Sequence, residues 1–84
     1  MIWCVEDDAS IRDIEVYALR SVGFEARGFS DGAAFWDALR AERPELVVLD
    51  VMLPGIDGYE VARTLRRKKN GTPILMLTAR SELE

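Results

Sequence analysis

The sequence predicts an α/β fold, in which a parallel sheet carries helices on both faces, and three observations lead to this class. Four short apolar runs alternate with three stretches of helical periodicity, so each strand is followed by a helix and then by another strand. The runs "LVVL" and "ILML" are continuously apolar, as is typical of strands buried on both faces. With 84 residues, 49% of them apolar and 31% charged, the chain has the size and composition of one globular domain. The strands are expected at Ile2–Val5, Phe24–Phe29, Leu46–Leu49 and Ile74–Thr78.

The first helix is expected in the stretch "ASIRDIEVYALRSVG", between the first two strands. Ser10, followed three positions later by Asp13, resembles a helix-start signal, and Asp8 is another candidate for the N-cap. Gly23 is expected to end the helix. The apolar residues that recur at helical spacing are Ile11, Ile14, Ala18 and Val22.

Two more helices are expected before the third and fourth strands. The stretch "SDGAAFWDALRAERP" has helical periodicity and ends before Pro44. The last helix starts with Asp57 as N-cap and Glu60 at the capping-box position, and it closes at Asn70-Gly71. The residues expected to face inward are Ala34, Phe35, Ala38, Leu39, Val61, Ala62 and Leu65.

Composition excludes several classes of protein. The formal net charge of -4 argues against nucleic-acid binding by this piece of chain. One group of cations falls at the end of the third helix, where positive charge complements the helix dipole. These cations are Arg63, Arg66, Arg67, Lys68 and Lys69. No apolar run can cross a bilayer, histidine is absent, and the single cysteine, Cys4, is expected to be a buried, inert thiol in a cytoplasmic protein.

Acidic residues follow the first and third strands. In a parallel sheet with strand order 2-1-3-4 these strands are neighbours, and their carboxyl ends share one edge with the end of the fourth strand. Glu6, Asp7 and Asp50 are therefore expected to converge, with Thr78 at the same edge. Three carboxylates at close range repel one another unless protons or a cation neutralise them. A hard divalent ion such as Mg²⁺ fits this set of oxygen ligands.

Asp50 could act as a nucleophile toward phosphorus, forming an acyl phosphate beside a metal ion that screens the charge. Each residue also has an ordinary structural explanation. Asp8 could only cap a helix, Asp50 could only begin a turn, and Thr78 could be a β-branched strand residue. Their joint placement at one sheet edge favours the functional interpretation.

Three motifs in order resemble a known family. The stretches "CVEDDASIR", "LVVLDVMLPGIDGYEVARTLR" and "PILMLTAR" are similar to the response-regulator receiver domain of two-component signalling, and the similarity covers essentially the whole chain. The resemblance implies a flavodoxin-like three-layer fold over residues 1–84. It also implies a signalling domain that assists its own phosphorylation, not an enzyme in its own right.

The resemblance further implies roles for single residues. Asp50 is the expected phosphoacceptor for a phosphoryl group from the histidine of a partner sensor kinase. Asp7 is expected to hold Mg²⁺ directly and Glu6 through water, and the main-chain carbonyl of Met52 is the family's further ligand. Thr78 matches the switch hydroxyl that binds the phosphoryl group.

The chain departs from the family pattern at its end. Family receivers carry a fifth strand, two further helices and a switch lysine on that strand, and the sequence stops before them, so residues 1–84 are expected to form a receiver truncated at its C-terminus. The first helix would then lie alone on one face, leaving the third and fourth strands uncovered there. Self-association through that face or the fourth-strand edge is expected. The parent is expected to be a transcriptional regulator with a winged-helix DNA-binding domain.

Other functions remain as alternatives. A receiver-like module could act only in self-association, without phosphoryl transfer. A metal-dependent phosphatase would also use an aspartyl nucleophile, but such enzymes commonly carry an acid/base aspartate at the position of Met52. A nucleotide-binding module is disfavoured, because no phosphate-binding glycine motif follows a strand.

Overall fold

A computed structural model describes residues 1–50, 58–67 and 71–77 of the chain. In these residues four strands alternate with three helices, as predicted. In chain order they are β1 (Ile2–Val5), α1 (Ala9–Ser21), β2 (Ala26–Phe29), α2 (Gly32–Leu39), β3 (Leu46–Asp50), α3 (Gly58–Arg67) and β4 (Ile74–Leu77).

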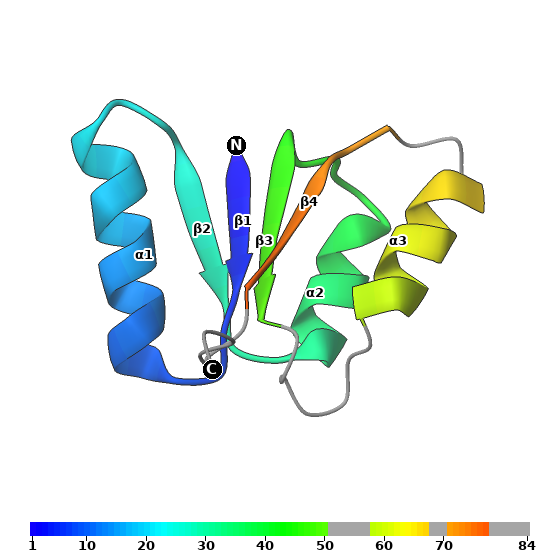
Figure 1. Ribbon diagram of the computed structural model, residues 1–84, viewed down its shortest axis with the longest axis horizontal. Coiled ribbons are helices and arrows are strands. Elements are labelled where there is room, and N and C mark those ends of the chain that lie inside the picture. Colours follow the sequence, from blue (N-terminus) through cyan, green and yellow to red (C-terminus); the bar gives the residue numbers. More distant parts are fainter. Residues whose placement is uncertain (51–57, 68–70, 78–84) are drawn as a thin grey trace, which may run out of the picture.

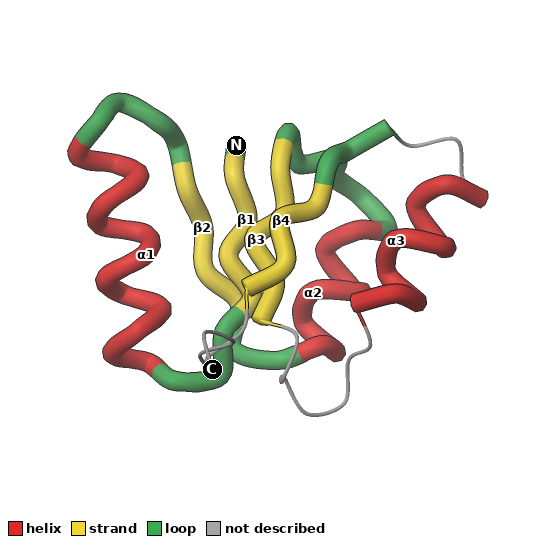
Figure 2. Tube along the Cα trace, in the orientation of Figure 1, coloured by secondary structure: helices red, strands yellow, loops and turns green. Residues whose placement is uncertain are grey.

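The strands form one parallel sheet in the order β2-β1-β3-β4, which confirms the predicted topology. Figure 1 shows α1 on one side of this sheet and α2 and α3 together on the other. The same three layers can be followed along the chain trace in Figure 2. The right-handed crossover rule explains the division, since the step from β1 to β2 runs in the opposite direction to the next two steps.

Two apolar cores lie on the two faces of the sheet, because successive strand residues point to opposite sides. The larger core joins the sheet to α2 and α3. Its fully buried side chains are Trp3, Val5, Phe35, Val47, Leu49, Val61 and Leu65. On the α1 face, Ile2, Cys4 and Val48 pack with the partly buried Val16 and Leu19. Both faces of β1 are therefore buried, as expected for a continuously apolar strand.

The ends of α1 are set by two capping structures. Asp8 is the N-cap, and its side chain accepts a hydrogen bond from the Ile11 N–H at 3.1 Å, so the start signal predicted at Ser10 was wrong. At the other end Gly23 has φ of 102°, and its N–H and that of Phe24 donate to carbonyls in the last turn. This is a Schellman motif. It uses Phe24, so β2 begins at Ala26 and not at the predicted Phe24.

The exposed and buried sides of α1 differ from the side suggested by its apolar spacing. Ile11, Ile14 and Val22 are exposed, Ile14 by 66%. The partly buried positions are Arg12, Glu15, Val16 and Leu19. The helix thus directs two apolar side chains, Val16 and Leu19, and two charged side chains, Arg12 and Glu15, toward the sheet.

The other two helices follow the prediction more closely. Asp31 caps α2 by accepting the Ala34 N–H at 2.8 Å, and Phe35 and Leu39 are buried, whereas Ala34 is exposed. In α3 Val61 and Leu65 are buried. A Cβ on Gly58 would lie 2.5 Å from Met76 Sδ, so the glycine allows α3 to start directly against β4. The N-cap predicted at Asp57 lies outside the described residues.

The α1 face of the sheet is only partly covered. Leu75 of β4 lies opposite Val48 in the register and is 51% exposed. Val48 itself is buried against Ile2 and Cys4. The sequence predicted that β3 and β4 are both uncovered on the α1 face. This prediction was wrong for β3, where Val48 is buried, and it is confirmed for β4, where Leu75 is exposed.

Candidate functional site

Three carboxylates gather at the edge of the sheet where β1 and β3 end. The register pairs Val5 with Leu49, so Glu6 and Asp50 are the next residues on two adjacent strands. One carboxylate oxygen from each of Glu6, Asp7 and Asp50 lies within 4.8 Å of the other two. The acidic cluster, as these three residues are called below, therefore has the predicted arrangement. Its oxygen-only donor set fits a hard divalent cation such as Mg²⁺.

Glu6 is the buried member of the cluster, with 6% of its surface exposed. Its N–H donates to the Phe29 carbonyl of β2 at 3.0 Å, which continues the sheet by one residue. Its side-chain Oε2 accepts the N–H of Asp8 at 3.1 Å. The Glu6 carboxylate is thus held by the same Asp8 that caps α1, and its direction is set by the turn that leads into the helix.

Burial and neighbouring negative charges both act on the Glu6 carboxyl. Loss of solvation raises the pKa of Glu6 above its ordinary value, and the negative charges of Asp50 and Asp7 raise it further. The hydrogen bond from the Asp8 N–H favours the ionised form and offsets part of this increase. A bound divalent ion would remove the repulsion, and this fit between charge and donor set supports a cation site.

A fourth carboxylate lies behind the acidic cluster, on the inward side of α1. Glu15 has one carboxylate oxygen, Oε1, that is buried and accepts no hydrogen bond from the described part of the chain. Burial raises the pKa of Glu15, with smaller contributions from the charges of Glu6 and Asp50. Sequence reasoning did not single out Glu15. The sequence feature that could have identified Glu15 is its helical spacing, three residues after Arg12 and four before Leu19, which places all three on the side of the helix that faces the sheet.

Cys4 lies on the same face of the sheet as Glu15 and is fully buried and unpaired. Burial, with a smaller contribution from the negative Glu15, raises the pKa of the Cys4 thiol to about 11. Because the thiolate is the reactive form, this environment suppresses its chemistry. The geometry agrees with the interpretation of Cys4 as a structural residue of the core.

Several predicted positions lie outside the described residues. Met52 and Thr78 are among them, as are Lys68 and Lys69 of the basic group. Within that group Arg66 and Arg67 occupy the last turn of α3, where the dipole favours cations, and Arg63 pairs with Glu60 at 3.6 Å. No helix among the described residues is long and apolar enough to cross a membrane.

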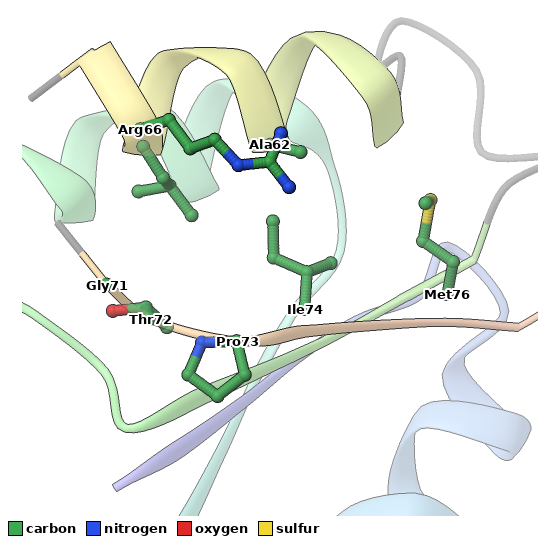
Figure 3. Close-up of a pocket in the computed structure, with 8 residues that line it drawn as sticks. Ala62, Arg66, Gly71, Thr72, Pro73, Ile74 and Met76 are labelled. Atoms are coloured by element: carbon green, nitrogen blue, oxygen red, sulfur yellow. The ribbon is translucent and has the colours of Figure 1, made fainter. Parts of the chain in front are cut away.

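A cavity of about 310 Å³ lies between α3 and β4 (Figure 3). Ile74 and Met76 point toward the helix, and Arg66 lies along its α3 side. The walls are otherwise formed by Ala62, Leu65 and the segment from Gly71 to Pro73. Because none of these residues carries a carboxylate, the cavity supplies no ligand to the acidic cluster.

The fold and the acidic cluster together define a class of protein: a doubly wound α/β domain with an acidic site at the carboxyl ends of neighbouring parallel strands. The family model described as "Response regulator receiver domain" matches residues 2–84. The chain belongs to this family of signalling domains, and its fold is the flavodoxin-like fold of receiver domains.

Curated relatives include a DNA-binding response regulator and a transcriptional regulatory protein. The chain is 44% identical over 81 residues to the DNA-binding response regulator MtrA of Mycobacterium tuberculosis, covering 96% of this chain and 35% of MtrA. It is 42% identical over 81 residues to the transcriptional regulatory protein CreB of Escherichia coli, with coverage of 96% and 35%. The chain thus spans about a third of the length of these relatives.

Solved receiver structures superpose closely. The response regulator TrrA of Thermotoga maritima, determined in complex with Mg(2+)-BeF, has a TM-score of 0.83 and 35% identity, covering 95% of this chain and 70% of TrrA. The chemotaxis response regulator CheY4 of Vibrio cholerae has a TM-score of 0.84 and 29% identity, with coverage of 96% and 69%.

Proposed function

We propose that this domain accepts a phosphoryl group on Asp50 from the phosphohistidine of a partner sensor kinase, in a Mg²⁺-dependent reaction. The convergence of the Glu6, Asp7 and Asp50 carboxylates is the observation that carries the proposal. The complex of the similar TrrA with Mg(2+)-BeF supports it. Since the related MtrA is a DNA-binding response regulator and the related CreB is a transcriptional regulatory protein, we propose that the parent protein is a DNA-binding regulator whose DNA contacts lie outside this chain.

The chemistry follows from the position of each residue. An Asp50 carboxylate oxygen attacks phosphorus, a new P–O bond forms as the P–N bond to the kinase imidazole breaks, and the imidazole takes the bond's electron pair. Asp7 and Asp50 would hold Mg²⁺ directly, Glu6 through water, and the Met52 carbonyl would complete the protein ligands. When bound, the ion neutralises charge on the incoming phosphoryl oxygens. The Thr78 hydroxyl would then bind the phosphoryl group on Asp50.

Replacing Asp50 with asparagine should abolish labelling while leaving the fold intact. Asparagine has almost the same shape, but its neutral amide is a poor nucleophile and a weaker ligand for a hard cation. We expect the intact mass of the native chain to rise by one phosphoryl group after treatment with acetyl phosphate and Mg²⁺, and that of Asp50→Asn to stay constant.

The exposed Asp37 is a matched control, because it is an aspartate that lies on α2 and outside the acidic cluster. Asp37→Asn should be labelled like the native chain. Labelling of Asp50→Asn at the native rate, or Mg²⁺ binding that is equally tight without Asp50, would contradict the proposed site.

We also propose that the domain self-associates through β4. Leu75 is 51% exposed on the α1 face, and β4 is one of the two outer strands of the described sheet, with one edge that the described residues leave unpaired. Size-exclusion chromatography with light scattering should show dimers or larger species at micromolar concentration, and Leu75→Lys should shift them toward monomer. A native chain that remains monomeric in this range rules the association out.

A further inference from the structure

Arg12 connects α1 to the peptide bond that joins two members of the acidic cluster. Its Nη1 donates a hydrogen bond to the main-chain carbonyl of Glu6 at 2.7 Å. This carbonyl belongs to the peptide between Glu6 and Asp7, so its direction fixes how the two carboxylates are presented relative to each other. The distance is short for an N–H to oxygen bond, as is typical when the donor carries a charge.

Two other polar groups next to this peptide are also hydrogen-bonded. The Glu6 N–H is bonded to Phe29 of β2, and the Asp8 N–H to the Glu6 carboxylate. Each of these bonds fixes one side of the Glu6-Asp7 peptide, whereas the bond from Arg12 fixes the peptide oxygen itself. Without Arg12 the Glu6-Asp7 peptide could rotate, because the strand bond before it and the cap after it would act only at its ends.

Gly28 of β2 gives the Arg12 side chain the space to reach this carbonyl. A Cβ built on Gly28 would lie 2.8 Å from Arg12 Cγ and 2.9 Å from Cδ, closer than carbon atoms approach in proteins. The backbone conformation of Gly28 does not require a glycine, because among the described glycines it is Gly23 that adopts a positive φ. The aliphatic part of Arg12 therefore occupies the space beside Gly28 that a larger side chain would fill, and the guanidinium reaches the Glu6 carbonyl.

We propose that Arg12 is a positioning residue for the acidic cluster and that Gly28, by lacking a side chain, leaves the space that Arg12 needs to reach the Glu6 carbonyl. The inference rests on the proposed function for its effect on Mg²⁺ binding, but not for its effect on the turn itself. Arg12 is not a ligand of the cation or of the phosphoryl group in the proposed site. It acts through the main chain of Glu6, in the way that residues behind a metal site orient the ligands.

The charge of Arg12 and its positioning role predict opposite outcomes. A positive charge beside a cation site repels the cation, so removing it would tighten Mg²⁺ binding if charge were its main contribution. Loss of a group that orients ligands instead weakens metal binding, typically by 10-fold or more. The sign of the change on neutralising Arg12 therefore separates the two effects.

The test uses Arg12→Gln, Gly28→Ala and a matched control on the same helix. Arg20 makes the equivalent bond at the other end of α1, where its Nη2 donates to the Ala26 carbonyl at 2.8 Å. Arg20→Gln thus removes one cation and one helix-to-strand hydrogen bond far from the acidic cluster. Gly28→Ala keeps the Arg12 charge and displaces only its side chain.

Two measurements are made on each variant of the full 84-residue chain. The exchange of the Asp8 N–H with water, followed by NMR without metal, reports on the turn. A Mg²⁺ titration reports on the acidic cluster. We expect Arg12→Gln and Gly28→Ala to accelerate Asp8 exchange and to weaken Mg²⁺ binding, each by about 10-fold, and Arg20→Gln to leave both at the native values.

Unchanged Asp8 exchange in Arg12→Gln, or tighter Mg²⁺ binding by that variant, overturns the inference. So does an Arg20→Gln variant that matches Arg12→Gln, because the effect would then come from general loosening of α1. A native chain that binds no Mg²⁺ refutes the proposed function alone, and the Asp8 exchange rates then decide the role of Arg12. If Gly28→Ala does not fold, Arg12→Gln and its control carry the test.

Discussion

Replacing Trp3 with alanine should remove most of the domain's stability, with a loss of about 3–5 kcal/mol in the free energy of unfolding. Trp3 is 1% exposed and joins two other rings, with centroid distances of 4.9 Å to Phe29 and 6.0 Å to Phe35. Both contacts are edge-to-face, and the Arg27 guanidinium lies over the Trp3 and Phe29 rings. Because a domain of this size has a total stability of roughly 5–10 kcal/mol, the variant should be close to unfolding at room temperature.

Urea denaturation followed by far-UV circular dichroism measures this loss. Trp36→Ala is the matched control, since Trp36 is only partly buried and contacts the core from its rim, 5.3 Å from the Phe35 ring. The control should lose about 1 kcal/mol. Equal losses from the two variants would mean that the aromatic cluster around Trp3 is not the centre of the core.

The strands next to the acidic cluster could be predicted closely because their apolar runs stop at charged residues. "IWCV" is followed by Glu6, and "LVVL" by Asp50, and the structure ends β1 at Val5 and β3 at Asp50. Once the order 2-1-3-4 is assumed, the meeting of these carboxylates follows from the rule that parallel strands end at one edge. The arrangement of the acidic cluster thus follows from the strand order, and the alternation of apolar runs and helical stretches in the sequence indicates the parallel sheet.

The orientation of α1 could not be predicted in the same way. Its sequence contains two overlapping apolar stripes, one through Ile11 and Ile14 and another through Val16 and Leu19, and periodicity alone does not rank them. The stripe that packs is the one that also carries Arg12 inward, because Gly28 opposite it leaves room for a long side chain. That choice depends on β2, a distant element, and so appears only in three dimensions.

The inward orientation of α1 also buries part of Glu15, and replacing this residue with glutamine should stabilise the metal-free domain at neutral pH. The native chain holds a carboxylate whose Oε1 is buried without a hydrogen-bond partner among the described residues. Glutamine keeps the shape and removes the charge. We expect a gain of about 1 kcal/mol in the free energy of unfolding at pH 7, measured by urea denaturation.

The gain should depend on pH in a direction set by the raised pKa of Glu15. A carboxyl whose folded-state pKa lies above its unfolded value favours the folded state when protonated, and this contribution is lost as the pH rises through the folded-state pKa. The native chain therefore recovers stability relative to Glu15→Gln as the pH falls from neutral. The difference in the free energy of unfolding between the two proteins should be absent below about pH 4.5, the ordinary pKa of a glutamate carboxyl. Glu25→Gln, at an exposed position, is the control for the loss of one carboxylate.

Adding Mg²⁺ at pH 7 separates the two causes of the raised pKa. Burial is the larger cause, and the charges of Glu6 and Asp50 add to it. A cation in the acidic cluster cancels only the repulsion from Glu6 and Asp50. Mg²⁺ should therefore reduce, but not remove, the difference in the free energy of unfolding between Glu15→Gln and the native chain. If saturating Mg²⁺ leaves the difference unchanged, Glu15 does not sense the charge of the cluster. If Mg²⁺ removes the difference completely, charge repulsion and not burial is the dominant cost of placing Glu15 on the inward side of α1.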